Sequence, residues 1–152
     1  MHAERAARPE LHEILADRLE ATGHRYTAAR RQLVDALLTA ARPVTLPELL
    51  GVDRSLRQSS AYRNLSVLES AGVVRRLVHS PGHAHYELAE NLTGHQHHLI
   101  CEECGSIRDV TLDARIERSL DQAFAGLAAG ANFAPRHHEL DLYGRCEDCA
   151  TA

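Results

Sequence analysis

Apolar residues recur at helical spacing in four successive stretches of the first half of the chain. Thr27 and Thr45 stand where a helix cap is needed, and Gly23 and Gly72 follow the stretches that they end, so each stretch has a start or stop signal. We therefore predict helices over residues 10–21, 27–40, 45–50 and 57–70. The residues predicted to face the core are Leu11, Ile14, Leu15, Leu19, Leu33, Val34, Leu37, Leu38, Ala61, Leu65 and Leu68.

After Gly72 the spacing of apolar residues changes from helical to alternating. Residues 73–79 and 83–88 predict two strands of a hairpin, with a turn at 80–82. Helices followed by a hairpin are the element order of a winged helix-turn-helix domain, in which the last helix enters the major groove of DNA. The same order also fits a protein-interaction domain, so the pattern alone leaves both alternatives open.

The second half of the chain alternates strands with one long helix. We predict strands over residues 97–101, 106–110 and 137–146, and a helix over 112–127 whose apolar stripe covers the resulting three-stranded sheet. The segment 89–94 between the two halves is predicted to be a hinge. The pattern as a whole predicts an α+β fold.

Composition places the 152-residue chain among soluble globular proteins, with 44% hydrophobic and 25% charged residues. The N-terminus lacks the apolar stretch of a signal peptide, and no run approaches the roughly 20 apolar residues of a membrane-spanning helix. We therefore expect a cytoplasmic protein with no membrane partner.

Charge divides the chain in two. Residues 23–76 hold nine arginines and four acidic residues, whereas residues 91–152 hold five arginines and ten acidic residues. The chain has no lysine, so its cationic side chains are those that suit contacts with phosphate and guanine. The two halves are predicted to have different roles.

All four cysteines fall into two CxxC pairs, Cys101 with Cys104 and Cys146 with Cys149, and 41 residues separate the pairs. Each pair stands at the end of a predicted strand, in a tight turn that can direct two thiolates at one ion. Disulfides are uncommon in cytoplasmic proteins, and a redox CxxC would not need a matching second pair. The pattern predicts a closed zinc site with four cysteine ligands, which stabilises the fold and leaves no position for a substrate.

Histidine is abundant, and eight of the eleven histidines lie in the range 79–138. In the strand that leads to Cys101, alternation sends His95 and His97 to one face and His98 to the other. This short stretch can therefore supply two separate metal sites.

The last strand offers a further candidate ligand. Alternation directs Leu140 and Leu142 to the core and Glu139 and Asp141 to water, which places His138 on the inward side. Glu117 flanks the apolar stripe of the helix that is expected to cover this sheet. Three histidines with a nearby carboxylate match a divalent cation of intermediate softness.

Polar residues also share one face of the second hairpin strand. They are His83, His85 and Glu87, opposite Ala84, Tyr86 and Leu88. Asp109 lies on the strand after the first cysteine pair. For His83 and His85 the favoured interpretation is an ordinary solvent-exposed polar face.

Four stretches, in this order, resemble the ferric uptake regulator family of bacterial metal-responsive regulators over nearly the whole chain. They are Arg25-Tyr26-Thr27 with Arg30-Arg31, SSAYRNLSVLESAGVVRRL at 59–77, HQHHLICEECG at 95–105 and HHELDLYGRCEDC at 137–149. The resemblance implies a homodimer that binds a palindromic operator in double-stranded DNA and represses transcription when its regulatory metal is bound. It implies a winged helix-turn-helix DNA-binding domain at 1–88, a hinge at 89–94 and a small α/β metal-binding dimerisation domain at 95–152.

The resemblance also assigns the DNA-reading residues. Tyr62 and Arg63 stand where the family keeps its DNA-contacting Tyr-Arg pair, whereas Ser60-Ala61 replaces the more usual Thr-Val before it. The residues implied to contact DNA are Arg25, Arg57, Ser59, Ser60, Tyr62, Arg63 and Asn64.

Two metal sites are implied besides the structural zinc. One, in the dimerisation domain, takes His95, His97, Glu117 and His138. The inter-domain site, often the sensor in this family, takes Glu87, His98 and Asp109. The histidine that the family usually adds after the second helix is absent, because residues 41–44 read Ala-Arg-Pro-Val, so His85 or His83 is the candidate replacement.

The regulatory metal is predicted to be iron(II), with Zn²⁺ as the alternative. Zinc-sensing members often add a further cysteine at the sensor site, and this chain has no fifth cysteine. Nitrogen and oxygen ligands accept iron, zinc, manganese or nickel, so the ligand types alone do not select among these metals. Peroxide-sensing members prefer aspartate at the position of Glu87, which favours metal sensing.

A zinc hydrolase is the alternative from another class. The sequence contains no HExxH motif and no nucleophile elbow. We therefore predict that the chain is not an enzyme and has no small-molecule substrate.

Overall fold

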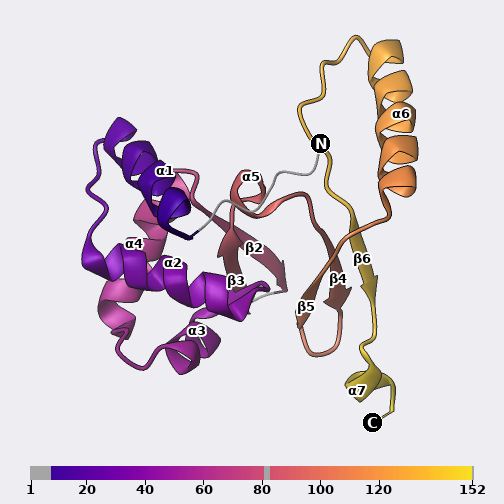
Figure 1. Ribbon diagram of the computed structural model, residues 1–152. Helices are drawn as coiled ribbons and strands as arrows, with labels where there is room; N and C mark the ends of the chain where they lie inside the picture. Colours follow the sequence, from indigo (N-terminus) through magenta and orange to yellow (C-terminus); the bar gives the residue numbers. More distant parts are fainter. Residues whose placement is uncertain (1–7, 81–82, 152) are drawn as a thin grey trace.

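The computed structural model describes residues 8–80 and 83–151, so Pro81 and Gly82 of the predicted hairpin turn lie outside the described residues. The helices are α1 (Arg8–Ala21), α2 (Ala28–Ala40), α3 (Leu46–Val52), α4 (Gln58–Ser70), α5 (Glu90–Thr93), α6 (Ala114–Gly130) and α7 (Glu147–Ala150). The strands are β1 (Val44–Thr45), β2 (Val74–Ser80), β3 (His83–Leu88), β4 (His97–Cys101), β5 (Ile107–Val110) and β6 (Asp141–Gly144). The predicted α+β class is confirmed, and Figure 1 shows the first half of the chain at one end of the molecule and the second half at the other.

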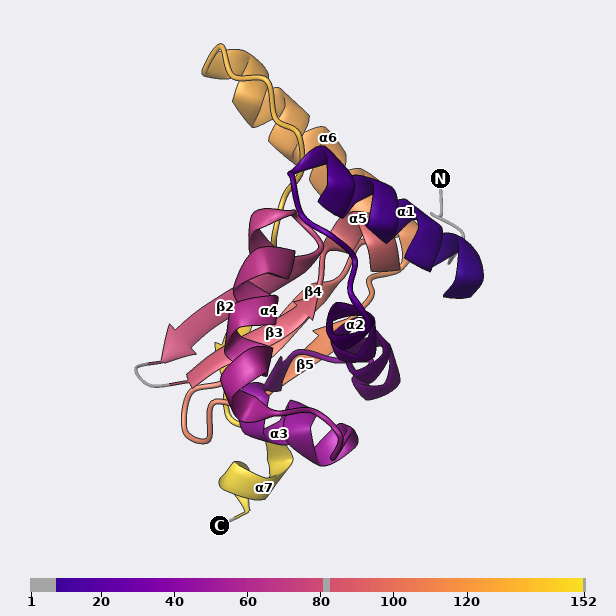
Figure 2. The ribbon, with the colours of Figure 1, turned by 90° about the vertical axis from the view of Figure 1, so that its left-hand side faces the viewer.

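The first half has a continuous hydrophobic core, formed where the apolar faces of α1, α2 and α4 meet β2 and β3. Figure 2 shows α4 lying across this hairpin. Leu15, Leu19 and Leu68 are completely buried, as the helical spacing predicted. The prediction for Ile14 is wrong, since this residue is 44% exposed: α1 packs along a stripe too narrow to include it.

Side-chain caps begin α2 and α3 where the sequence predicted them. Thr27 Oγ1 accepts a hydrogen bond from the backbone N–H of Arg30 at 3.4 Å. Thr45 Oγ1 accepts from the backbone N–H of Glu48, and the Glu48 carboxylate accepts from the backbone N–H of Thr45 at 2.7 Å, which completes a capping box. These bonds satisfy backbone donors that a helix start leaves free.

Strand β1 was not predicted, because two residues are too few to show alternation. It joins β2 and β3 in a sheet of order β1-β3-β2, in which Val44 pairs with Tyr86 and Thr45 with His85. The connection between α2 and α3 is thereby tied to the hairpin.

The second sheet has the order β5-β4-β6. Its central strand β4 is antiparallel to β5 and parallel to β6. The connection through α6 therefore returns the chain to the end of the sheet at which β4 begins, on the opposite side of β4 from β5. The predicted strand at 137–146 is shorter in the structure, where β6 covers Asp141–Gly144. Among the residues described, no helix combines the length and apolarity needed to cross a membrane.

The apolar stripe of α6 does not cover the sheet within one chain, contrary to the prediction. Figure 1 shows α6 standing beyond the end of the strands, and Leu127 is 73% exposed. On β6 the predicted faces are also wrong: Leu142 is 50% exposed, whereas Asp141 hydrogen-bonds to His98. Several large apolar side chains of this half therefore face solvent in the single chain.

The two halves of the chain meet on the face of the hairpin that lies away from the helices. Leu77 of β2 forms a small buried cluster with Ile100 of β4 and Ile107 of β5. His85, on the same side of the hairpin, is only 6% exposed. The prediction that His85 lies on a solvent-exposed face is therefore wrong, because the second sheet covers that face; the side chain of His83 lies outside the described part of the structure.

Candidate metal centres

Three groups of potential metal ligands come together in the described structure, and within each group the ligand atoms lie within 4.8 Å of one another. They are Cys101, Cys104, Cys146 and Cys149; His95, His97, Glu117 and His138; and Glu87, His98 and Asp109. The same three groups are expected from the sequence, except that His85 does not join the third. We refer to them as the cysteine cluster, the His95 cluster and the hinge cluster.

The cysteine cluster forms where β4 and β6 end side by side. Cys101, the last residue of β4, is paired in register with Gly144, the last residue of β6. A tight turn then brings Cys104 back, with Gly105 in the left-handed region at φ 71°. On the other side, Cys146 caps the short helix α7, which contains Cys149. Both CxxC turns therefore direct their sulfurs to the same point.

The sulfur positions fit one tetrahedral ion. Cys104 Sγ and Cys146 Sγ are 3.7 Å apart, close to the separation of about 3.8 Å that follows from zinc–sulfur bonds of about 2.3 Å in a tetrahedron. Backbone N–H groups of Cys104 and Cys146 donate towards Cys101 and lower the pKa of its thiol to about 6, whereas hydrogen bonding to the neighbouring Cys146 sulfur raises the pKa of Cys149. None of the four forms a disulfide, so the donor set fits a closed zinc site with four thiolate ligands.

The His95 cluster joins three separate elements around one carboxylate. His97 Nε2 lies 2.8 Å from Glu117 Oε1, and the Nε2 atoms of His95 and His138 each lie 3.5 Å from Glu117 Oε2. The Nε2 atoms of His95 and His138 are themselves only 3.1 Å apart. Ring nitrogens this close need a proton or a cation between them, so this donor set also fits a divalent metal.

Two carboxylates behind this cluster were not predicted. Glu90 of α5 contacts His95 Nδ1, and Asp121 of α6 lies 3.3 Å from His138 Nδ1. Carboxylates in this position orient a ligating imidazole by accepting from its second nitrogen. No alternation rule could have found them, because each approaches from a helix whose placement depends on tertiary packing.

The hinge cluster lies between the two sheets. Glu87 comes from β3, His98 from β4 and Asp109 from β5, and His98 pairs in register with Asp109. His98 Nε2 lies 3.3 Å from Glu87 Oε1 and 3.8 Å from Asp109 Oδ1. On the other side of the ring, Nδ1 donates to Asp141 Oδ1 at 3.0 Å, which leaves Nε2 directed at the two carboxylates.

Electrostatics in the hinge cluster favour an added cation. Burial alone would lower the pKa of His98, but hydrogen bonds to Glu87 and Asp141 outweigh it and raise the pKa to about 9. Burial and the negative charge of Glu87 raise the pKa of Asp109 to about 6. Asp109 Oδ1 is buried and has no hydrogen-bond partner among the described residues. An orphaned buried carboxylate oxygen is a costly group that a metal would satisfy.

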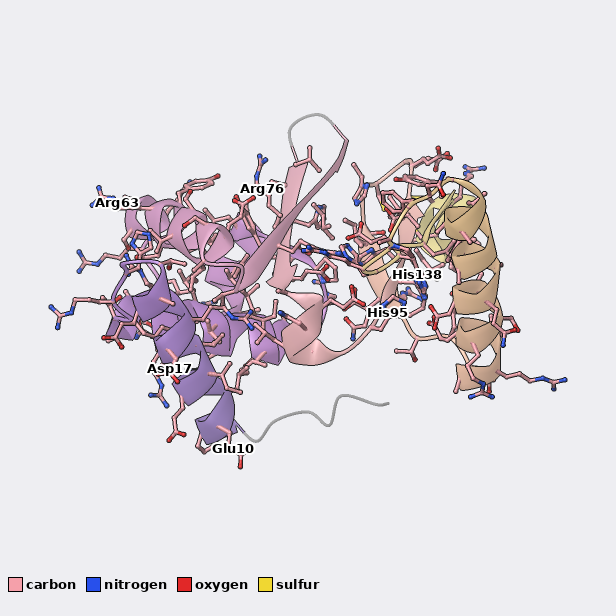
Figure 3. The ribbon with its side chains drawn as sticks, turned by 90° about the horizontal axis from the view of Figure 1, so that it is seen from above. Glu10, Asp17, Arg63, Arg76, His95 and His138 are labelled. Atoms are coloured by element: carbon pink, nitrogen blue, oxygen red, sulfur yellow. The ribbon has the colours of Figure 1, made fainter. Side chains whose placement is uncertain are left out.

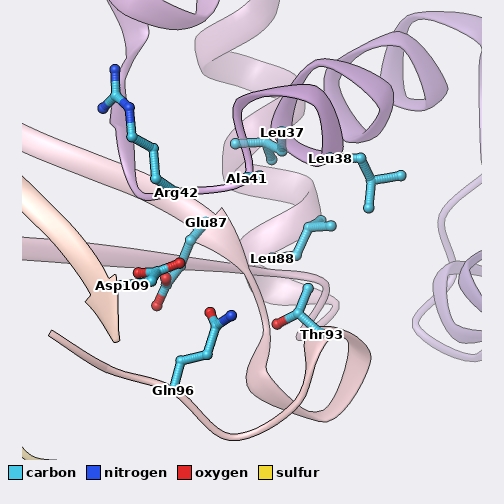
Figure 4. Close-up of a pocket in the computed structure, with 9 residues that line it drawn as sticks. All are labelled: Leu37, Leu38, Ala41, Arg42, Glu87, Leu88, Thr93, Gln96 and Asp109. Atoms are coloured by element: carbon cyan, nitrogen blue, oxygen red, sulfur yellow. The ribbon is translucent and has the colours of Figure 1, made fainter. Parts of the chain in front are cut away.

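A cavity of about 50 Å³ opens onto this cluster. Figure 4 shows the carboxylates of Glu87 and Asp109 side by side at the cavity, which Ala41 and Gln96 also line. Ala41 follows α2, in the segment where the resemblance implies a histidine that this chain lacks. His85 is not among the residues that line this cavity.

At this site the sequence predicted neither Arg75 nor the contact of Asp141 with His98. Arg75 pairs in register with Glu87, and its Nη2 atom lies 2.8 Å from Glu87 Oε1 and 3.5 Å from His98 Nε2. Its Nη1 atom contacts Glu139, in the segment before β6. The hairpin register, which pairs Arg75 with Glu87, is the signal that could have identified it.

The residues expected to contact DNA gather on one exposed surface of the first half. On α4, Ala61, Leu65 and Leu68 face the core, which leaves the opposite face in solvent; Figure 3 shows Arg63 pointing outward there, far from His95 and His138. The exposed members of the set are Arg25, Arg57, Ser59, Ser60, Tyr62 and Arg63, and Asn64 is half-buried.

Arg30 and His12 support this surface. Arg30 donates to the carbonyl of Arg25 and, through Nε, to Asn64 Oδ1 at 3.2 Å. His12 of α1 is buried between the Tyr26 hydroxyl at 2.6 Å and Asp35 Oδ1 at 3.1 Å. The segment that carries Arg25 is therefore held by side chains from α1, α2 and α4.

Comparison with a family model, curated relatives and solved structures finds ferric uptake and peroxide regulators. The model of the ferric uptake regulator family matches residues 21–143. The peroxide operon regulator of Bacillus subtilis is 28% identical over 145 residues, which cover 93% of this chain and 94% of that protein. Among solved structures, the ferric uptake regulator of Helicobacter pylori has a TM-score of 0.73 at 23% identity, covering 96% of this chain and 95% of that one. The ferric uptake regulator of Vibrio cholerae has a TM-score of 0.64 at 27% identity, covering 84% and 96%.

Proposed function

Because the chain belongs to the ferric uptake regulator family, we propose that it represses transcription by binding operator DNA as a homodimer when a regulatory divalent metal is bound. Proteins of this family are transcriptional regulators and not enzymes, so the hydrolase alternative has no support. The proposed division is a DNA-binding domain at 1–88, a hinge at 89–94 and a metal-binding dimerisation domain at 95–152.

The observation that carries this proposal is the hinge cluster. Its ligands come from both halves of the chain, Glu87 from the hairpin and His98 and Asp109 from the second sheet. A divalent cation bound to these ligands would link the two halves directly, in addition to their connection through the chain at 89–94. A fixed orientation of the two halves in turn sets the separation of the two recognition helices in a dimer, which must match about one turn of DNA.

The recognition surface is supported by charge and exposure. Arg63, Tyr62 and Arg57 all lie on the exposed face of α4 or at its start, where guanidinium groups reach guanine edges and phosphates. The hydrogen bonds of Arg30 and His12 hold this surface in shape before DNA arrives, which lowers the entropic cost of binding.

Dimerisation is supported by the apolar residues that a single chain leaves exposed. Ile116 and Leu127 on α6, and Leu142 and Tyr143 on β6, are all at least half exposed. An amphipathic helix without a covering partner is unfavourable in water, and a second copy presenting the same surface would cover it.

The proposed metals follow from the donor sets. Four thiolates suit structural Zn²⁺ at the cysteine cluster. The nitrogen and oxygen donors of the other two clusters suit Fe²⁺ or Zn²⁺ as the regulatory metal, with Fe²⁺ favoured because the hinge cluster contains no thiol. A zinc uptake regulator of the same family is the alternative.

A DNA-binding titration tests the proposal. Duplexes selected from a random pool by the metal-loaded chain would serve as the probe, and affinity would be measured by fluorescence anisotropy without metal and with Fe²⁺, Mn²⁺ or Zn²⁺. We expect tight binding only with metal, and its loss in Arg63→Ala but not in the control Arg118→Ala, an exposed arginine of α6. Equal binding by the metal-free and metal-loaded chains would contradict the proposed coupling.

A further inference from the structure

Arg75 places a fixed positive charge inside the proposed regulatory metal site. Its guanidinium lies 2.8 Å from Glu87 Oε1 and 3.5 Å from His98 Nε2. These are the same two atoms that would face the metal. Arg75 is not an ordinary solvent-exposed charge on a strand, because its side chain is only 25% exposed.

The guanidinium also links the two halves of the chain. Arg75 lies on β2 and contacts Glu87 on β3 within the first sheet, and it reaches Glu139 and His98 in the second half. The contacts of Arg75 therefore span the same gap as the ligands of the hinge cluster. Other described contacts also join the halves: the ion pair of His98 with Glu87, the hydrogen bond between His79 and the Tyr143 hydroxyl, and the apolar contact of Leu77 with Ile100 and Ile107.

We propose that Arg75 is a resident counter-cation of the hinge cluster, which closes the gap between the two halves without metal and competes with the metal for Glu87 and His98. This inference rests on the proposed function of the hinge cluster. A divalent ion and a guanidinium at van der Waals distance repel each other strongly in a partly buried site. Metal binding must therefore move Arg75 away from Glu87, and the affinity of the site is set lower than its ligands alone would give.

The position of the guanidinium makes this competition direct. Because Nδ1 of His98 donates to Asp141, a metal at this site would have to bind His98 through Nε2. Arg75 Nη2 lies 3.5 Å from that atom and 2.8 Å from Glu87 Oε1. The guanidinium and a metal ion therefore cannot occupy the space beside these two atoms at the same time.

The test is the affinity of the hinge cluster for Co²⁺ in the full-length chain. The cysteine cluster is loaded with Zn²⁺ beforehand, and the His95 cluster is disabled by His95→Ala and His138→Ala, so that Co²⁺ reports the hinge cluster alone. In this background we expect Arg75→Met to bind Co²⁺ at least about tenfold more tightly, because the competing charge is removed. Arg76→Met, the exposed neighbour on the same strand, should leave the affinity unchanged.

A second measurement reports the metal-free state. Limited proteolysis between residues 89 and 94 should be faster in metal-free Arg75→Met than in the metal-free parent, and Co²⁺ should restore protection to both. Arg75→Lys keeps the charge and should bind Co²⁺ more weakly than Arg75→Met. The proposed competition would be overturned if Arg75→Met and Arg75→Lys bound Co²⁺ equally more tightly than the parent, or if Arg75→Met bound it no more tightly than the parent.

Asp109→Ala separates the two levels of the proposal. If Asp109→Ala abolishes Co²⁺ binding but Arg75→Met leaves the affinity at the parent value, the role of Arg75 fails and the metal site stands. If Asp109→Ala binds Co²⁺ as tightly as the parent, the hinge cluster does not hold the metal, and the proposed function fails together with this inference.

Discussion

His98 donates a hydrogen bond from Nδ1 to Asp141 Oδ1 at 3.0 Å, and this bond fixes which nitrogen of the ring faces the hinge cluster. The same carboxylate stands on β6, beside His98 in the parallel register of the sheet. A partner of this kind sets the tautomer of a ligating histidine and increases its basicity.

Removing that partner should weaken the hinge cluster. We expect Asp141→Ala to lower the affinity of the site for its metal by about 10- to 100-fold, the usual effect of losing a hydrogen-bonded carboxylate behind a ligating histidine. Competition titration against a chelator would measure it. Asp17→Ala, an exposed carboxylate on α1 (Figure 3), is the control, and an unchanged affinity in Asp141→Ala would show that the ring is oriented by other contacts.

Loss of zinc should unfold the second half of the chain. Structural zinc contributes about 10–16 kcal/mol of binding free energy in small zinc domains, which is comparable with the whole stability of a domain. We therefore expect Cys146→Ser to bind no zinc at the cysteine cluster and to lose protection from hydrogen exchange in β4 and β6. Full zinc content with unchanged exchange would contradict a structural role, and re-addition of zinc to chelated wild-type chain is the control for reversibility.

The buried histidine of α1, His12, should support both stability and DNA binding. His12→Ala would leave the Tyr26 hydroxyl without its partner at 2.6 Å, at a cost of about 1–3 kcal/mol in the free energy of unfolding. DNA affinity should fall as well, since Tyr26 follows Arg25 directly. Urea unfolding and anisotropy would measure the two effects. His24→Ala, in the loop that carries Tyr26, should change the free energy of unfolding by less than about 0.5 kcal/mol. An equal loss of stability in His12→Ala and His24→Ala would show that His12 has no specific role.

The capping box of α3 predicts a pH-dependent contribution to stability. Burial alone would raise the pKa of Glu48, but hydrogen bonds from Thr45 and Arg42 outweigh it and hold the pKa below its usual value. A carboxyl whose pKa is lower in the folded state stabilises the fold above its unfolded pKa, and this contribution is lost as the pH falls through the folded pKa.

Glu48→Ala should therefore lower the free energy of unfolding by about 1 kcal/mol near neutral pH, and the difference from wild type should shrink below about pH 4. Thermal unfolding over a pH series would show this. Glu69→Ala, an exposed glutamate on α4, should show neither effect, and a difference that stays constant down to low pH would show that the carboxylate charge is not what stabilises the cap.

The exposed stripe of α6 predicts the oligomeric state. Leu127 is 73% exposed in the single chain, so Leu127→Glu has little cost within it. If a second copy covers this surface, the charge should dissociate the dimer, which sedimentation velocity would detect as a monomer. Val52→Glu alters an exposed apolar residue of the first half and should leave the dimer intact; a dimer that tolerates Leu127→Glu would place the interface elsewhere.

Local patterns predicted much of this molecule, because the interactions behind them act over a few residues. The caps at Thr27 and Thr45 formed as expected, since a cap needs only its own first helical turn. The alternation of side chains along one strand separated His97 from His98 correctly. The placement of each CxxC pair in a turn after a strand was predictable for a similar reason, because each turn is short and follows directly from the end of its strand.

Other features were decided by the tertiary structure, because they depend on what lies across a gap. His85 and Asp141 were expected to face water, yet the second sheet covers His85, and His98 recruits Asp141. The hairpin register pairs Arg75 with Glu87, but only the placement of the hairpin against β4 brings Arg75 to His98. The sequence by itself therefore determined the elements and most of the ligands, whereas the packing of the two sheets decided which polar groups are buried together and where the charge between them is balanced.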